Sequence, residues 1–250
     1  MNKKINSSSK SDFNNGMTGF IYKNIFFDLD HTIWDFETNS GLTLKVMYQE
    51  FNLSDRGVGP YEEFQIIYKE HNHRLWDRYS KGFIKQEELR WKRMWYTLLD
   101  YKIGDADLAK QISQRYLEVL PTQKELFPYT IEILKYLKSK NYELHIISNG
   151  FEKVQHEKLN NSGLTPYFKE VITSEGCNYV KPQKEIFEYA MQKTGALLKE
   201  SIMIGDNEEA DILGAFNTGM DSVYVNHINN EKDSKATYTI YHLKELENIL

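Results

Sequence analysis

Two carboxylates stand at the end of an apolar run in the segment IFFDLDHTIWDFE, residues 25–37. Asp28 follows the run directly, Asp30 comes two residues later, and Thr32 is close behind them. In an extended chain, positions i and i+2 project to the same side, so we expect both acids to face one point. Two acids at the carboxyl end of a buried strand suit metal binding combined with nucleophilic or acid–base chemistry. The simpler alternative is a turn whose aspartates cap the following helix.

Three later groups of polar residues also follow apolar runs. They are Ser148-Asn149-Gly150, Val180-Lys181-Pro182 and Gly205-Asp206-Asn207, the last of which is followed by Asp211. Each group alone is commonly a turn, a helix cap or, for Lys181, a solvated lysine. A hydroxyl and backbone amides that lead into a helix start, as at Ser148 and Asn149, suit a phosphate. Because ligands bind outside the carboxyl ends of the strands in an open α/β sheet, the order and placement of the four groups predict one site.

Short strands and helices alternate in the part of the chain that carries these groups. Near-continuous apolar runs predict strands buried on both faces at 21–28, 143–148, 170–174, 201–205 and 221–225. Helical segments are expected between them at 130–140, 151–161, 183–195 and 208–218. The alternation predicts an α/β fold with a doubly wound parallel sheet. The tail adds a short expected strand at 238–241 and a closing helix.

A helical insertion is expected after the first strand. Residues 39–125 contain no convincing strand, and helical patterns cover 40–52, 60–79, 85–100 and 105–119. We therefore predict a core formed by 20–38 and 126–250, with 39–125 as a helical cap. Residues 1–19 are polar and lack apolar periodicity, so we expect them to form a disordered arm.

The bulk composition excludes several classes of partner. The chain has 250 residues and a formal net charge of −5, which gives no reason to expect a nucleic-acid polymer or an anionic membrane as partner. Its single cysteine, Cys177, excludes an internal disulfide and fits a reducing cytosol. No apolar run approaches transmembrane length. We therefore expect a cytoplasmic protein that acts on a small molecule.

The four groups together resemble the motifs of the haloacid dehalogenase (HAD) superfamily of phosphohydrolases, in the same order along the chain. The residues that match are Asp28, Asp30 and Thr32 in the first motif, Ser148 in the second, Lys181 in the third, and Gly205, Asp206 and Asp211 in the fourth. The resemblance covers residues 20–250 and implies the strand order 3-2-1-4-5 with a small helical cap. Segments 28–40 and 82–93 are also similar to the pyrimidine 5′-nucleotidase-like members.

The resemblance implies a role for each acid. Asp28 would be the nucleophile that becomes an aspartyl-phosphate. Mg²⁺ would be held by Asp28, Asp206 and the backbone carbonyl of Asp30. The Asp30 side chain would protonate the leaving alcohol and then deprotonate the attacking water.

The other motif residues would bind the phosphoryl group or support the site. Ser148, the amide of Asn149 and Lys181 would hold the phosphoryl oxygens. Asp211 would orient Lys181 or the metal shell. Thr32, Gly205 and Asn207 complete the expected supporting set.

The turn at Ser80-Lys81-Gly82 is the expected substrate-facing part of the cap, because the corresponding turn of related caps faces the catalytic centre. Lys81 could reach a polar group of the substrate, and an aromatic residue near the turn could stack on a base. The commoner role of aromatic residues at helical spacing, such as Trp91 and Trp95, is packing.

Three functions remain open at this point. The first is a Mg²⁺-dependent phosphatase for a small phosphate monoester, with a nucleoside 5′-monophosphate as the expected substrate. The second is a sugar-phosphate mutase or phosphoglycolate-type phosphatase, which shares every catalytic residue. The third is a catalytically silent binding module, which would be expected to lack Asp28 or Asp30. Because displacing a halide needs no protonated leaving group, Asp30 favours phosphoryl transfer over dehalogenation.

Overall fold

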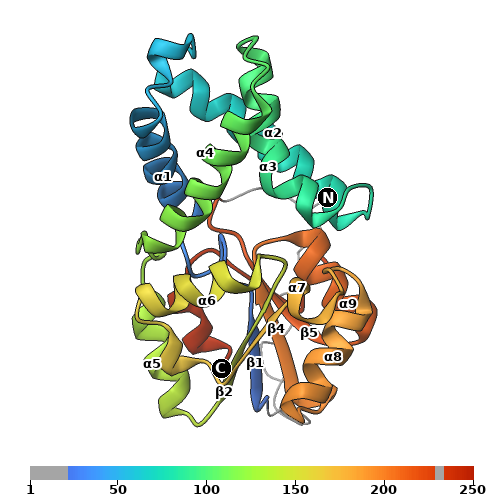
Figure 1. Ribbon diagram of the computed structural model, residues 1–250. Helices are drawn as coiled ribbons and strands as arrows, with labels where there is room; N and C mark the ends of the chain where they lie inside the picture. Colours follow the sequence, from blue (N-terminus) through green and yellow to red (C-terminus); the bar gives the residue numbers. More distant parts are fainter. Residues whose placement is uncertain (1–21, 229–233) are drawn as a thin grey trace, which may run out of the picture.

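A parallel sheet of six strands forms the centre of the computed structural model, which describes residues 22–228 and 234–250 (Figure 1). The strands are β1 Asn24–Phe27, β2 Glu143–Ser148, β3 Glu170–Thr173, β4 Ser201–Gly205, β5 Asp221–Val225 and β6 Tyr238–Ile240. Their order is β3-β2-β1-β4-β5-β6, and every pair is parallel. The expected doubly wound sheet and the order 3-2-1-4-5 are confirmed, and the tail adds the sixth strand. The arm expected at residues 1–19 lies outside the described residues.

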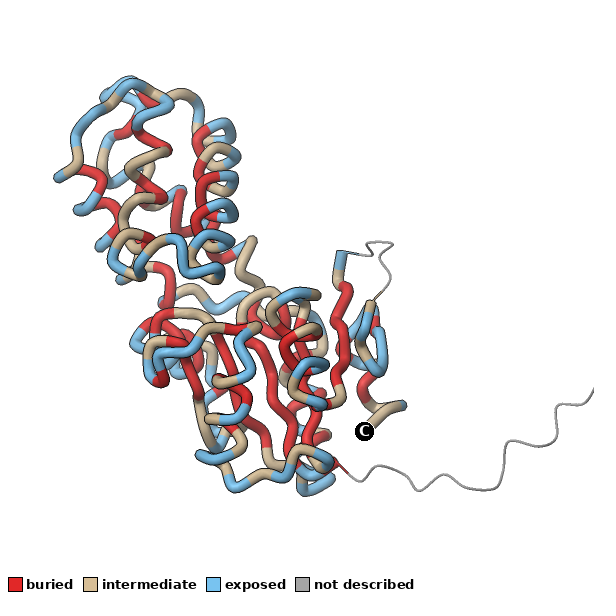
Figure 2. The backbone as a smooth tube through the Cα atoms, turned by 90° about the vertical axis from the view of Figure 1, so that its right-hand side faces the viewer, coloured by how far each residue is buried: buried red, intermediate tan, exposed pale blue. Residues whose placement is uncertain are grey.

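The strand residues alternate between two hydrophobic cores. Ile25 and Phe27 face one core, whose helices are α5 Thr130–Ser139 and α6 Glu152–Asn161. Phe26 and Met203 face the other, whose helices are α8 Lys184–Thr194 and α9 Gly214–Thr218. Because both faces are covered, the strands read as almost continuous apolar runs rather than as alternating ones. The buried strands lie in the middle of the lower part of Figure 2.

Four long helices form a bundle above the carboxyl ends of the strands (Figures 1 and 2). They are α1 Phe36–Glu50, α2 Tyr61–Ser80, α3 Gln86–Asp100 and α4 Ala106–Val119. The first of them begins four residues earlier than expected, because Asp35 caps it: one carboxylate oxygen accepts the Thr38 N–H at 3.0 Å and the other the Thr38 hydroxyl at 2.6 Å. The expected change from core to cap at residues 38 and 39 therefore falls inside α1.

The two chain crossings between sheet and bundle are bound to each other. The Asn39 side chain donates to the Glu125 carbonyl at 2.8 Å and accepts the Glu125 N–H at 3.0 Å. The Asp35 N–H also donates to the Glu125 carbonyl, at 3.1 Å. Asn39 is fully buried, so these bonds are shielded from water.

The segment after β4 differs from the single helix expected at 208–218. A π-helix, η5 Glu208–Leu213, precedes α9, and its wider turn is closed by the Ile212 N–H, which donates to the Asn207 carbonyl at 3.2 Å. The Asn207 side chain caps the turn by accepting the N–H groups of Glu209 and Ala210. Such π turns are rare and occur frequently at functional sites.

The remaining elements are short. They are α7 Ser174–Cys177 and the 3₁₀ turns η1 Ser54–Arg56, η2 Leu120–Thr122, η3 Thr165–Tyr167, η4 Leu198–Glu200 and η6 Leu243–Asn248. The last replaces the closing helix expected at the tail. Within 22–228 and 234–250, no helix combines the length and the apolar character that a membrane crossing requires.

A buried histidine lies in the middle of the sheet. His145 on β2 is inaccessible to solvent, and its ring stacks on Phe26 with 4.9 Å between the centroids. Neither ring nitrogen has a hydrogen-bond partner among the residues that the structure describes. Burial lowers the pKa of His145 to about 4, so the neutral ring packs as an aromatic side chain.

We predict that His145→Phe makes stability less dependent on pH. Between pH 6.5 and pH 4 the unfolded chain protonates this imidazole while the folded chain does not, so the free energy of unfolding falls as the pH falls. The shift corresponds to at most about 3 kcal/mol at 1.36 kcal/mol per pKa unit. Urea unfolding at pH 7 and pH 4.5 measures it, and the drop should be smaller in the variant than in the wild type. An equal drop in the free energy of unfolding of both proteins would contradict the lowered pKa of His145.

Candidate active site

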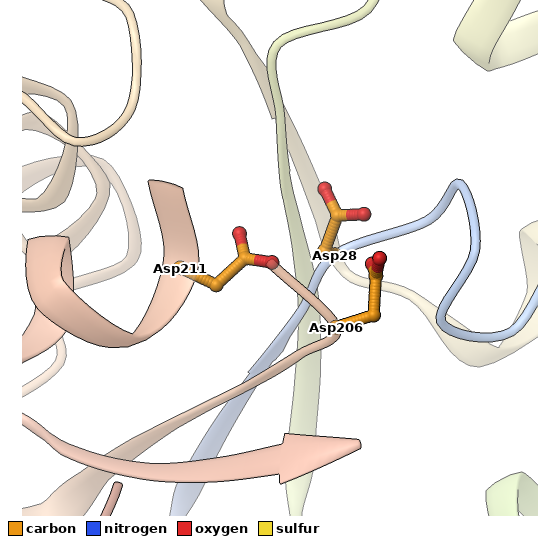
Figure 3. A group of neighbouring side chains, drawn as sticks. All are labelled: Asp28, Asp206 and Asp211. Atoms are coloured by element: carbon orange, nitrogen blue, oxygen red, sulfur yellow. The ribbon is translucent and has the colours of Figure 1, made fainter. Parts of the chain in front are cut away.

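Three carboxylates meet where the neighbouring strands β1 and β4 end. Asp28 follows β1, Asp206 follows β4, and Asp211 lies on η5. One oxygen from each lies within 4.8 Å of the others. Figure 3 shows the three side chains turned toward one another. The adjacency of β1 and β4 in the sheet therefore brings together residues that are far apart in the sequence.

A buried lysine lies among these acids. The Lys181 ammonium is 2.6 Å from an oxygen of Asp28, 2.6 Å from one of Asp211 and 2.8 Å from the Ile147 carbonyl. Burial alone would lower the pKa of Lys181, but the charges of Asp211 and Asp28 more than offset it and raise the pKa. The lysine therefore stays protonated beside the expected nucleophile.

The site carries an excess of negative charge. Burial, and then the charges of Asp211 and Asp30, raise the pKa of Asp28 to about 7 although Lys181 opposes them. Burial and the same kind of repulsion from Asp211 and Asp28 raise the pKa of Asp206 well above its usual value. One ammonium does not balance these carboxylates. Asp28, Asp206 and Asp211 form a group that could hold a divalent cation with a preference for oxygen ligands, such as Mg²⁺.

Both carboxylate oxygens of Asp211 accept hydrogen bonds within the protein. One of its oxygens binds Lys181, and the other accepts the Asn207 N–H at 3.0 Å. A Cβ on Gly205 would lie 2.3 Å from the Asp211 carboxylate, so this position requires glycine. Thr32 donates its hydroxyl to Asp206 at 3.0 Å. The expected supporting residues therefore all lie around the acids.

The end of β2 lies beside the same group. The Ser148 hydroxyl oxygen accepts the Gly150 N–H at 3.1 Å. The Asn149 side chain donates to the Lys181 carbonyl at 3.0 Å and accepts the Lys181 N–H at 2.8 Å. This side chain is therefore committed to joining two loops, which leaves the Asn149 backbone N–H as the group that could meet a phosphate.

The side chain of Asp30 lies apart from the other acids. Its carboxylate oxygens contact Lys158 at 2.6 Å and Gln155 at 3.0 Å, both on α6. The carboxylate group therefore consists of Asp28, Asp206 and Asp211, and the Asp30 side chain is not part of it. The expectation that i and i+2 face one point holds only in extended chain, and the backbone turns after Asp28: the N–H of Trp34 donates back to the Leu29 carbonyl at 2.9 Å.

Gln155 and Lys158 were not among the residues expected at the site. Both are almost completely buried on the face of α6 that also carries Val154 and Leu159. Burial lowers the pKa of Lys158, and the charge of Asp30 acts against this. The signal in the sequence was a pair of long polar side chains three positions apart on an apolar helix face, directly after the second motif.

The cap turn lies across from the loop that follows β4. Lys81 pairs with Asp77 of its own helix at 2.5 Å, and this hydrogen bond, with a smaller contribution from the Glu209 charge of the core, raises the pKa of Lys81. Gly82 adopts a φ of 74°, a conformation that suits glycine.

The aromatic residues of the cap divide into two groups. Trp76 reaches the core, with 5.7 Å between its ring and that of Phe151. Trp91 and Trp95 pack on each other within α3. A hollow of about 470 Å³ between α3, α4 and α6, lined in part by Trp91 and Phe151, contains none of the motif residues.

Comparison with known proteins identifies the family. The profile of haloacid dehalogenase-like hydrolases matches residues 22–219. The pyrimidine 5′-nucleotidase PynA of Streptococcus pneumoniae is 31% identical over 229 residues, which are 90% of this chain and 94% of that protein. The pyrimidine 5′-nucleotidase YjjG of Escherichia coli is 29% identical over 231 residues, 90% of this chain and 96% of that protein.

Solved structures share the fold. The magnesium-bound HAD-hydrolase YfnB of Bacillus subtilis superposes with a TM-score of 0.83 at 28% identity, covering 92% of this chain and 98% of that one. A 2-haloacid dehalogenase of Pseudomonas syringae has a TM-score of 0.64 at 24% identity, with 91% and 97% covered, and shares the fold alone. Because the family profile spans most of the chain and its motif residues meet at one sheet edge, the chain belongs to the haloacid dehalogenase-like hydrolases and is an enzyme.

Proposed function

We propose that the enzyme is a Mg²⁺-dependent phosphatase that hydrolyses small phosphate monoesters, with nucleoside 5′-monophosphates as substrates, through an aspartyl-phosphate. The observation that carries the proposal is the separation of two acids with different partners. Asp28 lies beside Lys181 in the acidic group, and Asp30 is held by α6. Phosphate ester hydrolysis needs such a nucleophile and a separate proton donor.

The first step forms the intermediate. An oxygen of Asp28 attacks phosphorus, and the bond from phosphorus to the leaving alcohol breaks. Bound Mg²⁺, held by Asp28, Asp206 and the Asp30 carbonyl, would neutralise the repulsion between carboxylate and phosphate. Lys181 adds positive charge next to the nucleophile, and the Ser148 hydroxyl and the Asn149 N–H donate to the phosphoryl oxygens.

Asp30 provides the proton transfers. As the alcohol leaves, the proton of the Asp30 carboxyl group passes to the oxygen of the alcohol. The resulting carboxylate then takes a proton from the water that attacks the aspartyl-phosphate, which regenerates Asp28 and releases phosphate. A dehalogenase releases halide, which needs no such proton, and Asp30 therefore supports a phosphatase.

The proposal of a nucleotide substrate rests on the relatives and on the cap. Two relatives that cover nine-tenths of the chain are named as pyrimidine 5′-nucleotidases. Trp76 offers an aromatic surface where cap and core meet, and a base could stack there. Interdomain movement is stated for the YfnB structure. The corresponding movement here would separate Arg90 of the cap from Glu175 of the core, which pair at 3.0 Å.

We predict that Asp28→Asn lowers kcat on the order of 10⁴-fold or more, because asparagine keeps the shape of the side chain but cannot form the acyl-phosphate. The fold should persist, because asparagine still offers an oxygen to the Lys181 ammonium and Asp211 keeps its contact with it. The matched control is Asp55→Asn, on an exposed cap turn, which should keep full activity. Normal turnover by a folded Asp28→Asn protein would refute the mechanism.

We predict that activity is lost after chelation and returns with Mg²⁺. Mg²⁺ should also raise the Tm of the wild type, since a ligand that binds only the folded state stabilises it. Asp206→Asn should lose this rise, because it removes an expected ligand. Full activity after exhaustive treatment with EDTA, measured together with residual metal content, would rule out the metal requirement.

We predict that pyrimidine nucleoside monophosphates are the best substrates. The comparison is kcat/KM for UMP and dTMP against β-glucose 1-phosphate and phosphoglycolate. A Trp76→Leu variant should lose at least about fivefold in kcat/KM for the nucleotides and little for phosphoglycolate, as expected from loss of base stacking. If either of the other two phosphates is preferred tenfold or more, the sugar-phosphate or phosphoglycolate alternative replaces the nucleotidase assignment.

A further inference from the structure

Two polar side chains of α6 are buried directly behind the site. Gln155 is 0% exposed and Lys158 is 2% exposed, on a face that otherwise carries apolar residues. Burying an amide and an ammonium costs stability unless both find good partners. Their partners are residues of the first and second motifs, so the contacts connect this helix to the chemistry.

Lys158 and Gln155 together fix the plane of the Asp30 carboxyl group. Lys158 donates to one oxygen at 2.6 Å, and Gln155 donates to the other at 3.0 Å. A carboxylate has about four lone-pair positions, so each oxygen keeps one for the substrate or water. The ammonium is itself restrained, because it lies 4.4 Å from the centre of the Trp34 ring.

Gln155 also contacts Ser148. Its amide donates to the Ser148 hydroxyl oxygen at 2.7 Å, and the Gly150 N–H donates to the same oxygen at 3.1 Å. Because both hydrogen bonds are received by the oxygen, the hydroxyl hydrogen of Ser148 remains available to donate to a phosphoryl oxygen.

The NH₂ group of the Gln155 amide faces Asp30 and Ser148, to both of which it donates. This orientation suits the ionised carboxylate that the proton transfer leaves, because an ionised carboxylate only accepts hydrogen bonds. The amide oxygen is then left without a hydrogen-bond partner among the described residues. A Cβ on Gly150 would lie 2.4 Å from the Gln155 amide carbon, so glycine at 150 makes room for this arrangement. An unpaired buried oxygen costs stability, and the two hydrogen bonds that the NH₂ group donates keep the amide in place despite this cost.

We propose that Gln155 and Lys158 are positioning residues of the active site. Lys158 holds Asp30 for the transfer of its proton to the leaving oxygen, and its ammonium faces the carboxylate that this transfer creates. Gln155 holds both Asp30 and the phosphate-binding hydroxyl of Ser148. This inference rests on the proposed phosphatase function.

The test compares leaving groups. We expect Lys158→Met to lower kcat/KM for nucleoside monophosphates by about 30-fold or more, since general acid catalysis contributes about 10²–10⁴-fold. For p-nitrophenyl phosphate, whose leaving group departs without a proton, the loss should stay below about threefold. Because kcat/KM covers only the steps up to loss of the alcohol, the comparison isolates the acid step.

Gln155→Met should show a different pattern. It disturbs Ser148 as well as Asp30, so it should lower kcat/KM for both kinds of substrate, and more for the nucleotides. The matched control is Lys153→Met, on the same helix but with a side chain that is 84% exposed; it should change neither value. In an Asp30→Asn background, Lys158→Met should lower kcat/KM for the nucleotides by less than about twofold more.

Lys158→Arg provides the conservative variant and should restore part of the nucleotide activity. If circular dichroism and thermal melting show that Lys158→Met does not fold, Lys158→Arg replaces it in the comparison of leaving groups. An equal loss for all leaving groups, or no loss, would overturn the positioning role while the phosphatase function stands. A wild type without Mg²⁺-dependent activity on any phosphate ester would instead overturn the proposed function.

Discussion

The site depends on one buried ion cluster, in which Lys181 lies between Asp28 and Asp211. The three residues come from the end of β1, the loop before α8 and the π-helix η5. A buried ammonium without partners would be unstable, and the acids without it would repel each other, so these segments are stable only when they meet together. Burial, together with the charges of Asp211 and Asp30, raises the pKa of Asp28 to about 7 even though Lys181 of the cluster opposes this.

Three neighbouring residues, Asn149, Asn207 and Gly205, keep this cluster in place. The Asn149 side chain binds both backbone groups of Lys181. The Asn207 N–H binds Asp211, and Gly205 leaves the space that the Asp211 carboxylate fills. Each of these groups lies at or just after a strand end, so the rigidity of the sheet passes to the reacting groups. Positioning of this kind is what electrostatic catalysis requires.

The features that could be predicted from the sequence are those that local residue patterns indicate. Buried parallel strands appear as short apolar runs, and the polar residues after them predicted that Asp28, Lys181 and Asp206 lie close together, as the structure has them. The π turn at η5 could not be predicted, because it is a change in hydrogen-bond register with no composition of its own. The partners of Asp30 could not be predicted either, since they depend on how α6 docks against the turn after β1.

The bonds between Asp35, Asn39 and Glu125 have a consequence for how the cap can move and be exchanged. Two chain crossings that were independent would let the bundle twist as well as tilt. Because Glu125 is bound to both Asp35 and Asn39, we expect the two crossings to act as a single hinge and to favour rotation about one axis. A chimera that grafts a foreign cap onto this core should therefore take all three residues from one parent, with its junctions before Asp35 and after Glu125.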